Sequence, residues 1–399
     1  MNTQDVIGQF DRFVIGNYKR LPVVVERAAG SEMWDLDGKR YLDFFPGWGV
    51  GLLGHCHPRV VEAIQQQAGR LLHIDNTMYT LPQGELAQLI AERSFGGQCF
   101  FCNSGAEANE AAIKLARLAA GEGRYKILSM QRSFHGRTFA AMSATGQAKI
   151  QEGFTPIVAG FAHVPFNDLE AVAHAIDDET AAVLVEPIQG EGGVHVPADD
   201  YLPRLRSLCD ERGVLLICDE VQTGCGRTGK WFGYQQWGVE PDIMTLAKGL
   251  GSGVSIGAMV ARPEIAEKLV PGKHATTYGG SPLVCAAGVA VFRAIEAEGL
   301  LAHAEAMGQR IMDGVRAMSS PLVREVRGRG VMIGVELTQP GDQIVADALA
   351  AGLRINCTQQ TVVRMLPAMN ISPEQVDEGL GILAEVMRNN EQVGAGAAE

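Results

Sequence analysis

Residues 98–120, QCFFCNSGAEANEAAIKLARLAA, decide the fold class, because an apolar run, a small-residue turn and a helical pattern follow one another directly. The run at 98–102 predicts a strand, and the residues from Gly105 onward have the apolar spacing of an amphipathic helix. Ser104 stands at the N-cap position of that helix. Ser104, Gly105 and Ala106 are also small enough to let an anion approach the N–H groups at the helix start. The residues alone leave both interpretations open, an ordinary capped turn and a phosphate-binding turn.

The middle of the chain repeats this alternation of apolar runs and helix-length segments. The predicted strands are residues 98–102, 125–130, 181–187, 214–220, 242–248 and 256–261, and two predicted helices are 105–120 and 199–213. Strand, helix and strand in succession, with nearly continuous apolar strands, are typical of a mostly parallel sheet that is covered on both faces. The predicted fold class is therefore α/β.

The two ends of the chain have a different pattern. Residues 23–44, VVVERAAGSEMWDLDGKRYLDF, predict a hairpin with an Asp-Gly turn, separate from the main sheet. The C-terminal part predicts a helical region at 283–319 broken near Gly299, strands within 323–337, 352–357 and 361–368, and a last helix from Ser372. We therefore expect an N-terminal segment at 1–50 that packs with a small α+β domain at 291–399, and a large cofactor-binding domain at 51–290.

The composition excludes several classes of partner. Lys and Arg number 34 against 46 Asp and Glu, so the formal net charge of the 399 residues is -12. An acidic chain without a basic run argues against nucleic acid or an anionic membrane as the main partner. We find neither a membrane-length apolar window nor the pattern of a secretion signal. Eight scattered cysteines suit a reducing compartment, so we expect a cytoplasmic protein that acts on small molecules.

Two predicted strands end in residues of opposite charge. Asp219 lies at the end of the predicted strand VLLICDE (214–220). A buried carboxylate is costly unless a positive group faces it. Ligands of open α/β sheets bind beyond the carboxyl ends of the strands, so we expect Asp219 to face a cation in a cleft. Lys248 ends the strand DIMTLAK. A partly desolvated Lys248 would have a lowered pKa and could attack a carbonyl group. The plain alternatives are a solvated loop aspartate and a strand-end lysine in water.

A phosphate cradle, a carboxylate and a nucleophilic lysine at one sheet edge are the set that pyridoxal phosphate requires. A rival phosphate loop is TGCGRTGK at 223–230, which matches G-x-G-x-x-G and nearly matches a nucleotide-binding P-loop. Trp231 stands where the P-loop needs Ser or Thr, and no strand directly precedes the glycines. We interpret this stretch as a glycine-rich surface turn. A nucleotide-dependent enzyme and a non-catalytic binding protein remain the rival hypotheses.

Six stretches in the same order resemble the class III (ω-amino-type) aminotransferases, and acetylornithine-type members most closely. The stretches are NSGAEANEAAIKLAR, SFHGRTF, VEPIQGEGGV, ICDEVQTGCGRTGKWF, LAKGLGSG and TTYGGSPL. The resemblance implies the aspartate-aminotransferase fold (PLP fold type I), with a large domain around a mostly parallel sheet and a smaller α+β domain. It also implies pyridoxal 5'-phosphate as cofactor, and a homodimer with shared active sites.

The resemblance implies a role for each residue near the cofactor. Lys248 would bond to the cofactor's aldehyde, Asp219 would face the ring nitrogen, and Gln222 would lie near the phenolic oxygen. Phe134, in SFHGRTF, would stack on the ring, although core filling is the plain alternative. Thr277 would contact the phosphate held by the other subunit. The phosphate-binding turn would be formed by Ser104, Gly105 and Ala106.

The resemblance also implies how substrates are held. Arg137 and Arg364 would bind carboxylates, for which a guanidinium is suited. Glu191 would neutralise Arg364 when no substrate carboxylate occupies it, and Tyr18 would contact substrate. The implied reaction moves the terminal amino group of N2-acetylornithine to 2-oxoglutarate. The alternative donors are ornithine, succinylornithine, succinyl-diaminopimelate and 4-aminobutyrate, and no metal is implied.

Overall fold

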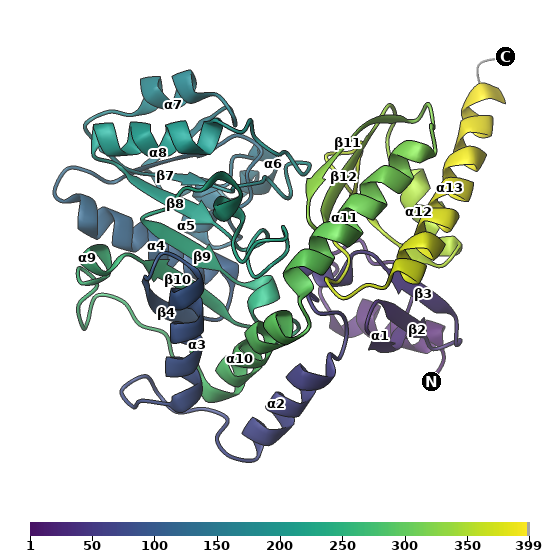
Figure 1. Cartoon of the computed structure of the whole chain (residues 1–399), viewed down its shortest axis with the longest axis horizontal. Helices are drawn as coiled ribbons and strands as arrows, with labels where there is room; N and C mark the ends of the chain where they lie inside the picture. Colours follow the sequence, from purple (N-terminus) through teal and green to yellow (C-terminus); the bar gives the residue numbers. More distant parts are fainter. Residues whose placement is uncertain (397–399) are drawn as a thin grey trace.

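The computed structural model describes residues 1–396, which form three sheets and the helices around them. Figure 1 shows the largest sheet with its helices on one side of the molecule and the two smaller sheets on the other. Within residues 1–396, none of the helices combines the length and the apolar character needed to cross a bilayer.

The largest sheet has seven strands in the order β4-β10-β9-β8-β7-β5-β6. The strands are β4 (Gln98–Cys102), β5 (Lys126–Met130), β6 (Phe161–Val164), β7 (Thr180–Val185), β8 (Leu215–Asp219), β9 (Ile243–Leu246) and β10 (Gly257–Ala261). β10 runs antiparallel to β4 and β9, and all the other pairs are parallel. The predicted mostly parallel sheet is therefore confirmed, and each predicted strand is present. β6 was not predicted, because its four residues, FAHV, include a polar histidine and give no clear apolar run.

Helices cover both faces of this sheet. α4 (Gly105–Ala120) has the predicted bounds, and α8 (Tyr201–Arg212) lies within the predicted 199–213. The buried face of α4 is rich in alanine, so its backbone approaches the strands closely. The other helical elements on this side are α2 (Pro58–Ala68), α3 (Leu81–Arg93), α5 (Phe139–Ala144), α6 (Ala148–Gln151), α7 (Leu169–Ala175), α9 (Pro263–Ala266) and α10 (Pro282–Ala297), and the 3-10 turns η1 (Pro46–Gly49), η2 (Gly233–Trp237) and η3 (Lys248–Leu250).

The C-terminal part forms a four-stranded antiparallel sheet in the order β11-β12-β15-β14. Its strands are β11 (Val323–Arg329), β12 (Met332–Leu337), β14 (Asn356–Thr358) and β15 (Val362–Met365), and its helices are α11 (Leu300–Ala317), α12 (Asp342–Ala350) and α13 (Pro373–Gly396). The predicted break near Gly299 is confirmed, because Gly299 separates α10 from α11 with φ +63°. Glycine adopts this left-handed conformation without a steric penalty.

The N-terminal sheet is built from both ends of the chain. Its strands are β1 (Val25–Ala29), β2 (Glu32–Asp35), β3 (Arg40–Asp43) and β13 (Leu353–Arg354), and α1 (Thr3–Phe13) precedes them. The predicted hairpin turn lies at Asp37 and Gly38, where Gly38 has φ +82°. β13 pairs with β3 in parallel, so backbone hydrogen bonds join the first 50 residues to the C-terminal part.

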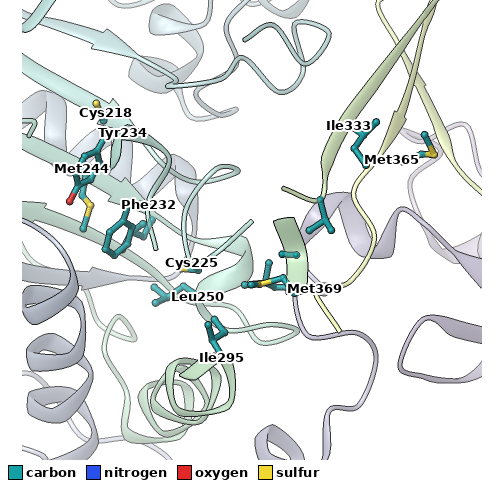
Figure 2. Packing of buried hydrophobic residues seen from close by; sticks show 14 of the residues in the cluster. Cys218, Cys225, Phe232, Tyr234, Met244, Leu250, Ile295, Ile333, Met365 and Met369 are labelled. Atoms are coloured by element: carbon teal, nitrogen blue, oxygen red, sulfur yellow. The ribbon is translucent and has the colours of Figure 1, made fainter. Parts of the chain in front are cut away.

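One apolar core runs between the largest sheet and the C-terminal sheet. Figure 2 shows Met244 of β9 at one end of the drawn part of this cluster, and Ile333 of β12 and Met365 of β15 at the other. Leu250 and Met369 lie between these two ends. The two sheets therefore contribute buried side chains to a single apolar cluster.

The interpretation of TGCGRTGK as a surface turn is wrong, because residues 223–229 are buried. Arg227 is only 1% exposed, and its guanidinium donates to the carbonyl oxygens of Gly49 at 3.1 Å and Leu366 at 3.0 Å, and to that of Pro367. Burial lowers the pKa of Arg227 to about 9. Gly226 packs so closely on Met369 that an added Cβ would lie 2.6 Å from its Cε atom. The glycines therefore permit close packing against a remote part of the chain.

Candidate active site

A cavity of about 390 Å³ lies where β8 and β9 end, at the edge of the sheet where ligands bind in open α/β folds. Most of the predicted site residues meet in its wall. They are Ser104, Gly105, Ala106, Phe134, Arg137, Glu191, Asp219, Gln222 and Lys248. Arg364 contacts Glu191 and Gln222 of this wall from β15. The structure therefore brings these residues together from distant parts of the chain.

Lys248 follows β9 and begins η3 with φ +41°. A left-handed lysine is unusual, and such strain is typical of sites where the surrounding structure fixes the backbone. Burial lowers the pKa of the Lys248 amine, and the nearby Arg364 lowers it further, while Glu191 and other carboxylates oppose the shift. The lowered pKa favours the unprotonated amine, which is the nucleophilic form.

Asp219 ends β8 and is buried, as predicted. Its Oδ2 atom accepts from Asn109 Nδ2 at 2.8 Å and lies 2.8 Å from His135 Nδ1. Its Oδ1 atom accepts from the Val221 amide at 3.0 Å. These bonds hold the carboxylate in one orientation and leave it in the cavity wall, where a cationic group of a ligand could face it.

Asn109 was missed by the sequence reasoning, although a signal for it exists. It lies on the buried, alanine-rich face of α4, where an amide requires hydrogen-bond partners. Asn109 Oδ1 accepts from Thr245 Oγ1 at 2.8 Å, and Thr245 stands opposite Asp219 in the pairing of β8 with β9. Asn109 therefore connects the strand that carries Asp219 with the strand that leads to Lys248.

The sequence left open whether the start of α4 is an ordinary capped turn or a phosphate-binding turn, and it has the features of both. Ser104 is the N-cap, and its hydroxyl accepts from the Glu107 amide at 3.2 Å. The same helix start lines the cavity, and the first amides of a helix have no partner within the helix. An added Cβ on Gly105 would lie 2.8 Å from a methyl group of Val221, so this turn has no room for a side chain. The turn can therefore bind an anion such as a phosphate.

A second buried carboxylate, Glu186, was also missed. Its Oε2 atom accepts from the Phe134 amide at 3.2 Å, and its Oε1 atom accepts from the Gly190 amide at 3.1 Å. Burial raises the pKa of Glu186 to about 7. Glu186 thus fixes both the segment that carries Phe134 and the loop that carries Glu191.

Arg364 and Glu191 form an ion pair at the cavity. Arg364 is 1% exposed, and its two terminal nitrogens lie 2.7 Å and 3.1 Å from the two Glu191 oxygens. Burial opposes the ionisation of Glu191, but Arg364 outweighs it and holds the pKa of Glu191 below its ordinary value. Arg137, by contrast, is exposed 5.7 Å from the Phe134 ring centre, and no acidic side chain of residues 1–396 lies within ion-pair distance of it. One arginine is neutralised and the other is free.

Besides Arg364, which contacts the cavity wall from β15, two predicted residues lie outside that wall. Tyr18 is exposed, and its ring centre lies 6.2 Å from that of Trp48. Thr277 is exposed in the segment before α10. In the part of the chain that the structure describes, neither residue reaches Lys248 or Asp219 through a hydrogen bond.

The donor set of the cavity fits pyridoxal phosphate. The start of α4 suits its phosphate, and Lys248, with its lowered pKa, suits its aldehyde. Asp219, held by three hydrogen bonds, suits a protonated ring nitrogen. The arrangement can therefore hold such a cofactor with its reactive carbon beside an amine and its ring nitrogen beside a carboxylate.

Comparison with known proteins leads to the same class. The family model described as "Aminotransferase class-III" matches residues 14–387. The acetylornithine aminotransferase of Caldanaerobacter subterraneus subsp. tengcongensis is 48% identical, covering 94% of this chain and 97% of its own length. That of Methanocaldococcus jannaschii is 47% identical, covering 97% of this chain and 98% of its own length.

Solved structures of similar fold cover almost the whole chain. The ornithine aminotransferase of Toxoplasma gondii superposes with a TM-score of 0.94 at 33% identity, covering 98% of this chain and 96% of its own. The acetylornithine aminotransferase of Elizabethkingia anophelis has a TM-score of 0.87 at 31% identity, covering 98% of this chain and 100% of its own. The chain has the aspartate-aminotransferase fold, PLP fold type I, and it belongs to the class III aminotransferases, which use pyridoxal phosphate.

Proposed function

We propose that this enzyme transfers the terminal amino group of N2-acetylornithine to 2-oxoglutarate, as in arginine synthesis. The products are N-acetylglutamate 5-semialdehyde and glutamate. The relatives that carry the name acetylornithine aminotransferase support this substrate, because they are 43% to 48% identical over nearly the whole chain. Ornithine is the second candidate donor, supported by the TM-score of 0.94 with an ornithine aminotransferase.

The observation that carries the proposal is the contrast between the two arginines. A donor that reacts through its terminal amine brings no carboxylate to the reacting end, so an unneutralised Arg364 would face it without a partner. Glu191 supplies the negative charge at 2.7 Å. Arg137 is exposed in the cavity wall and is available for the carboxylate at the far end of the donor. When 2-oxoglutarate binds, the carboxylate next to its keto carbon replaces Glu191 at Arg364.

We propose the following roles for the residues at the reacting atoms. The bound cofactor supplies an electron-withdrawing ring conjugated to the substrate carbon that loses its proton. Lys248 Nζ holds the cofactor covalently at rest and, once released, moves the proton of that carbon as general base and acid. Asp219, fixed by Asn109 and His135, holds a proton on the ring nitrogen.

The remaining residues position the cofactor. Gln222 would lie near the phenolic oxygen of the bound cofactor, and Phe134 would pack against its ring. Ser104, Gly105 and Ala106 at the start of α4 would bind the phosphate, and Tyr18 would contact the substrate. These roles are supported by the shared cavity wall for all but Tyr18, which rests on the family resemblance.

A parallel assay of four donors with 2-oxoglutarate tests the substrate. The donors are acetylornithine, ornithine, succinylornithine and 4-aminobutyrate, and the measurement is kcat/KM for each at a fixed concentration of 2-oxoglutarate. We expect acetylornithine to give the highest value. A higher value for ornithine or 4-aminobutyrate would overturn the proposed substrate and leave the aminotransferase class intact.

We also propose a homodimer in which Thr277 reaches the partner's cofactor phosphate. Large apolar side chains are exposed beside Thr277, which is typical of a surface that another chain covers. They are Leu71, Leu72, Met78, Tyr79, Leu81 and Tyr278. Asn76 Nδ2 donates to the Gly279 carbonyl at 2.9 Å, so the 71–81 segment lies against the segment that carries Thr277. A hollow of about 730 Å³ between α2 and α10 adjoins Tyr79 and Leu81.

Sedimentation equilibrium tests the dimer. We expect the enzyme to have twice the chain mass of 42.7 kDa. The double substitution Tyr79→Asp and Leu81→Asp should shift it toward the single chain, whereas Phe154→Asp, at another exposed apolar residue, should not. A single-chain mass for the unaltered enzyme would contradict the proposal.

Two further expectations remain proposals. The domain division at 1–50, 51–290 and 291–399 is one; the pairing of β13 with β3 supports the part of it that joins the first segment to the last. The cytoplasm is supported as the location because all eight cysteines are free.

A further inference from the structure

The strand β14 lies beside the strand that carries Arg364. β14 pairs only with β15 among the described residues, so it forms an edge of the C-terminal sheet. In this pairing Asn356 stands opposite Arg364, and Thr358 stands opposite Val362. Asn356 and Thr358 are two residues apart, and residues at this spacing project from the same face of a strand.

Both residues contact the ion pair of the active site. Asn356 Oδ1 accepts from Arg364 Nη2 at 3.1 Å. Thr358 Oγ1 donates to the carbonyl oxygen of Glu191 at 2.7 Å, and Gln359 Nε2 donates to the same oxygen at 3.0 Å. One short edge strand and its turn therefore hold the side chain of Arg364 and the main chain of Glu191.

The turn that follows β14 has a strained backbone. Gln359 and Gln360 have φ values of +49° and +66°. Two successive left-handed residues are typical of a type I′ hairpin turn, where Asn and Gly are preferred because other residues pay a steric cost. Such strain persists where the surroundings fix the backbone, and it is common beside functional sites. The Gln360 carbonyl accepts from the Gly341 amide at 2.8 Å, which helps to hold this turn.

The loop that carries Glu191 is fixed from the same sheet at a second point. Arg327 of β11 donates through Nη2 to the Gly193 carbonyl at 2.7 Å and through Nε to the Val194 carbonyl at 3.1 Å. Val194 is itself left-handed at φ +53°, which is costly for a β-branched residue. With its main chain held on both sides, Glu191 can separate from Arg364 by rotation of its side chain.

We propose that Asn356, Thr358 and Gln359, here called the β14 clamp, are positioning residues that determine specificity. The β14 clamp holds Glu191 against Arg364 and so sets how readily a dicarboxylate displaces Glu191. The inference rests on the proposed function, in which Arg364 serves a neutralised state for the amino donor and a carboxylate-bound state for 2-oxoglutarate. Without the clamp, Arg327 and Glu186 would still hold the neighbouring residues of the loop, but the main chain of Glu191 itself would be less fixed and its ion pair with Arg364 would weaken.

Two pairs of substitutions isolate the clamp. Thr358→Val removes the hydroxyl that donates to Glu191, and Thr358→Ser retains it. Gln359→Gly relieves a left-handed residue and removes a bond to Glu191, whereas the matched control Gln360→Gly relieves a left-handed residue without removing a side-chain bond to Glu191. The probe is glutarate, an unreactive dicarboxylate, whose binding to the holoenzyme is measured by calorimetry.

We expect glutarate to bind about three- to tenfold more tightly to Thr358→Val and Gln359→Gly, the range expected for the loss of one hydrogen bond. The affinity of Thr358→Ser and Gln360→Gly should stay within about twofold of the unaltered enzyme. In steady-state assays, kcat/KM for the amino donor should fall relative to that for 2-oxoglutarate in the first two variants. Equal changes in Gln359→Gly and Gln360→Gly would overturn the inference, as would equal losses for both substrates.

The same experiment separates this inference from the proposed substrate. If ornithine proves to be the better donor, the substrate proposal fails, while the glutarate affinities still decide the role of the clamp. If glutarate does not bind the unaltered enzyme, Arg364 is not a dicarboxylate site, and the inference fails together with the assignment of that arginine.

Discussion

His135 Nδ1 lies 2.8 Å from Asp219 Oδ2, and both side chains are buried. Asn109 donates to the same oxygen at 2.8 Å, so two side chains from different segments fix one carboxylate. These contacts orient the carboxylate without the help of a ligand. This preorganisation is what an electrostatic partner of a buried cation requires.

The first prediction concerns His135. His135→Leu removes the ring that faces Asp219, and a hydrogen bond to a charged group is worth about 1.5–3 kcal/mol, so kcat/KM should fall at least about tenfold. His135→Asn can place an amide N–H near the position of Nδ1 and should restore most of the activity. Equal losses in both variants would contradict a positioning role, and thermal unfolding of both variants controls for a loss of fold.

The second prediction concerns Lys248. Lys248→Ala removes the amine that holds the cofactor, so the visible absorbance of the lysine-bound cofactor should be lost and kcat should fall by at least about 100-fold. Lys230→Ala serves as the control, because Lys230 is the lysine of the rival P-loop match. We expect Lys230→Ala to keep its absorbance and its activity. An unchanged spectrum in Lys248→Ala would refute the assignment.

The third prediction concerns the helix start at Gly105. Gly105→Ala would place a Cβ 2.8 Å from Val221, so α4 and its first amides must shift away from the phosphate position. We expect the dissociation constant for pyridoxal phosphate, measured by titration of the apoenzyme, to rise about tenfold, which corresponds to about 1.4 kcal/mol. The control is Gly381→Ala in α13, where nothing lies within 4 Å of the added Cβ. That variant should bind the cofactor normally.

The fourth prediction concerns Glu220, a buried carboxylate next to Asp219. Burial raises the pKa of Glu220 from 4.5 to about 7, so the folded chain binds more protons than the unfolded chain between these values. The contribution of this group to stability is complete below about pH 4.5 and is lost as the pH rises through about 7. The urea midpoint should therefore fall less between pH 5 and pH 8 in Glu220→Gln than in the unaltered enzyme. Identical pH dependence would contradict the raised pKa.

The fifth prediction concerns Arg227. Arg227→Met leaves the carbonyl oxygens of Gly49, Leu366 and Pro367 without their donor. We expect the free energy of unfolding to fall by about 3 kcal/mol, since each buried group left unpaired costs about 1–3 kcal/mol. Arg204→Met, at an exposed ion pair, should change it by less than about 1 kcal/mol. Denaturant titration measures both variants.

The sequence predicts most of the largest sheet because its strands are apolar and its helices have regular spacing. It also predicts Asp219 and Lys248, because a charged residue that ends an apolar strand is unusual in itself. Asn109 and Glu186 were missed, since their importance comes from partners that are remote in sequence, Asp219 and the amides of Phe134 and Gly190. No local pattern records such contacts.

The burial of Arg227 was missed for the same reason. Glycines between polar residues are typical of an exposed turn, whereas here Gly226 packs against Met369 and Gly224 against the Glu220 carbonyl. Tyr18 and Thr277 illustrate a different limit. Their predicted roles require a substrate or a second subunit, so the fold of one chain gives them no contact with the cavity.

The shared core of the two sheets has a consequence for engineering. Because Met369 and Leu250 belong to one apolar cluster with Ile333 and Met365, exchanging the C-terminal segment for that of a relative would cut through packed side chains. A chimaera of this kind would have poorly packed apolar side chains close to Arg364, the arginine proposed to bind substrate. New donor preferences should therefore be sought by single substitutions on the strand next to that arginine, and not by grafting a whole segment.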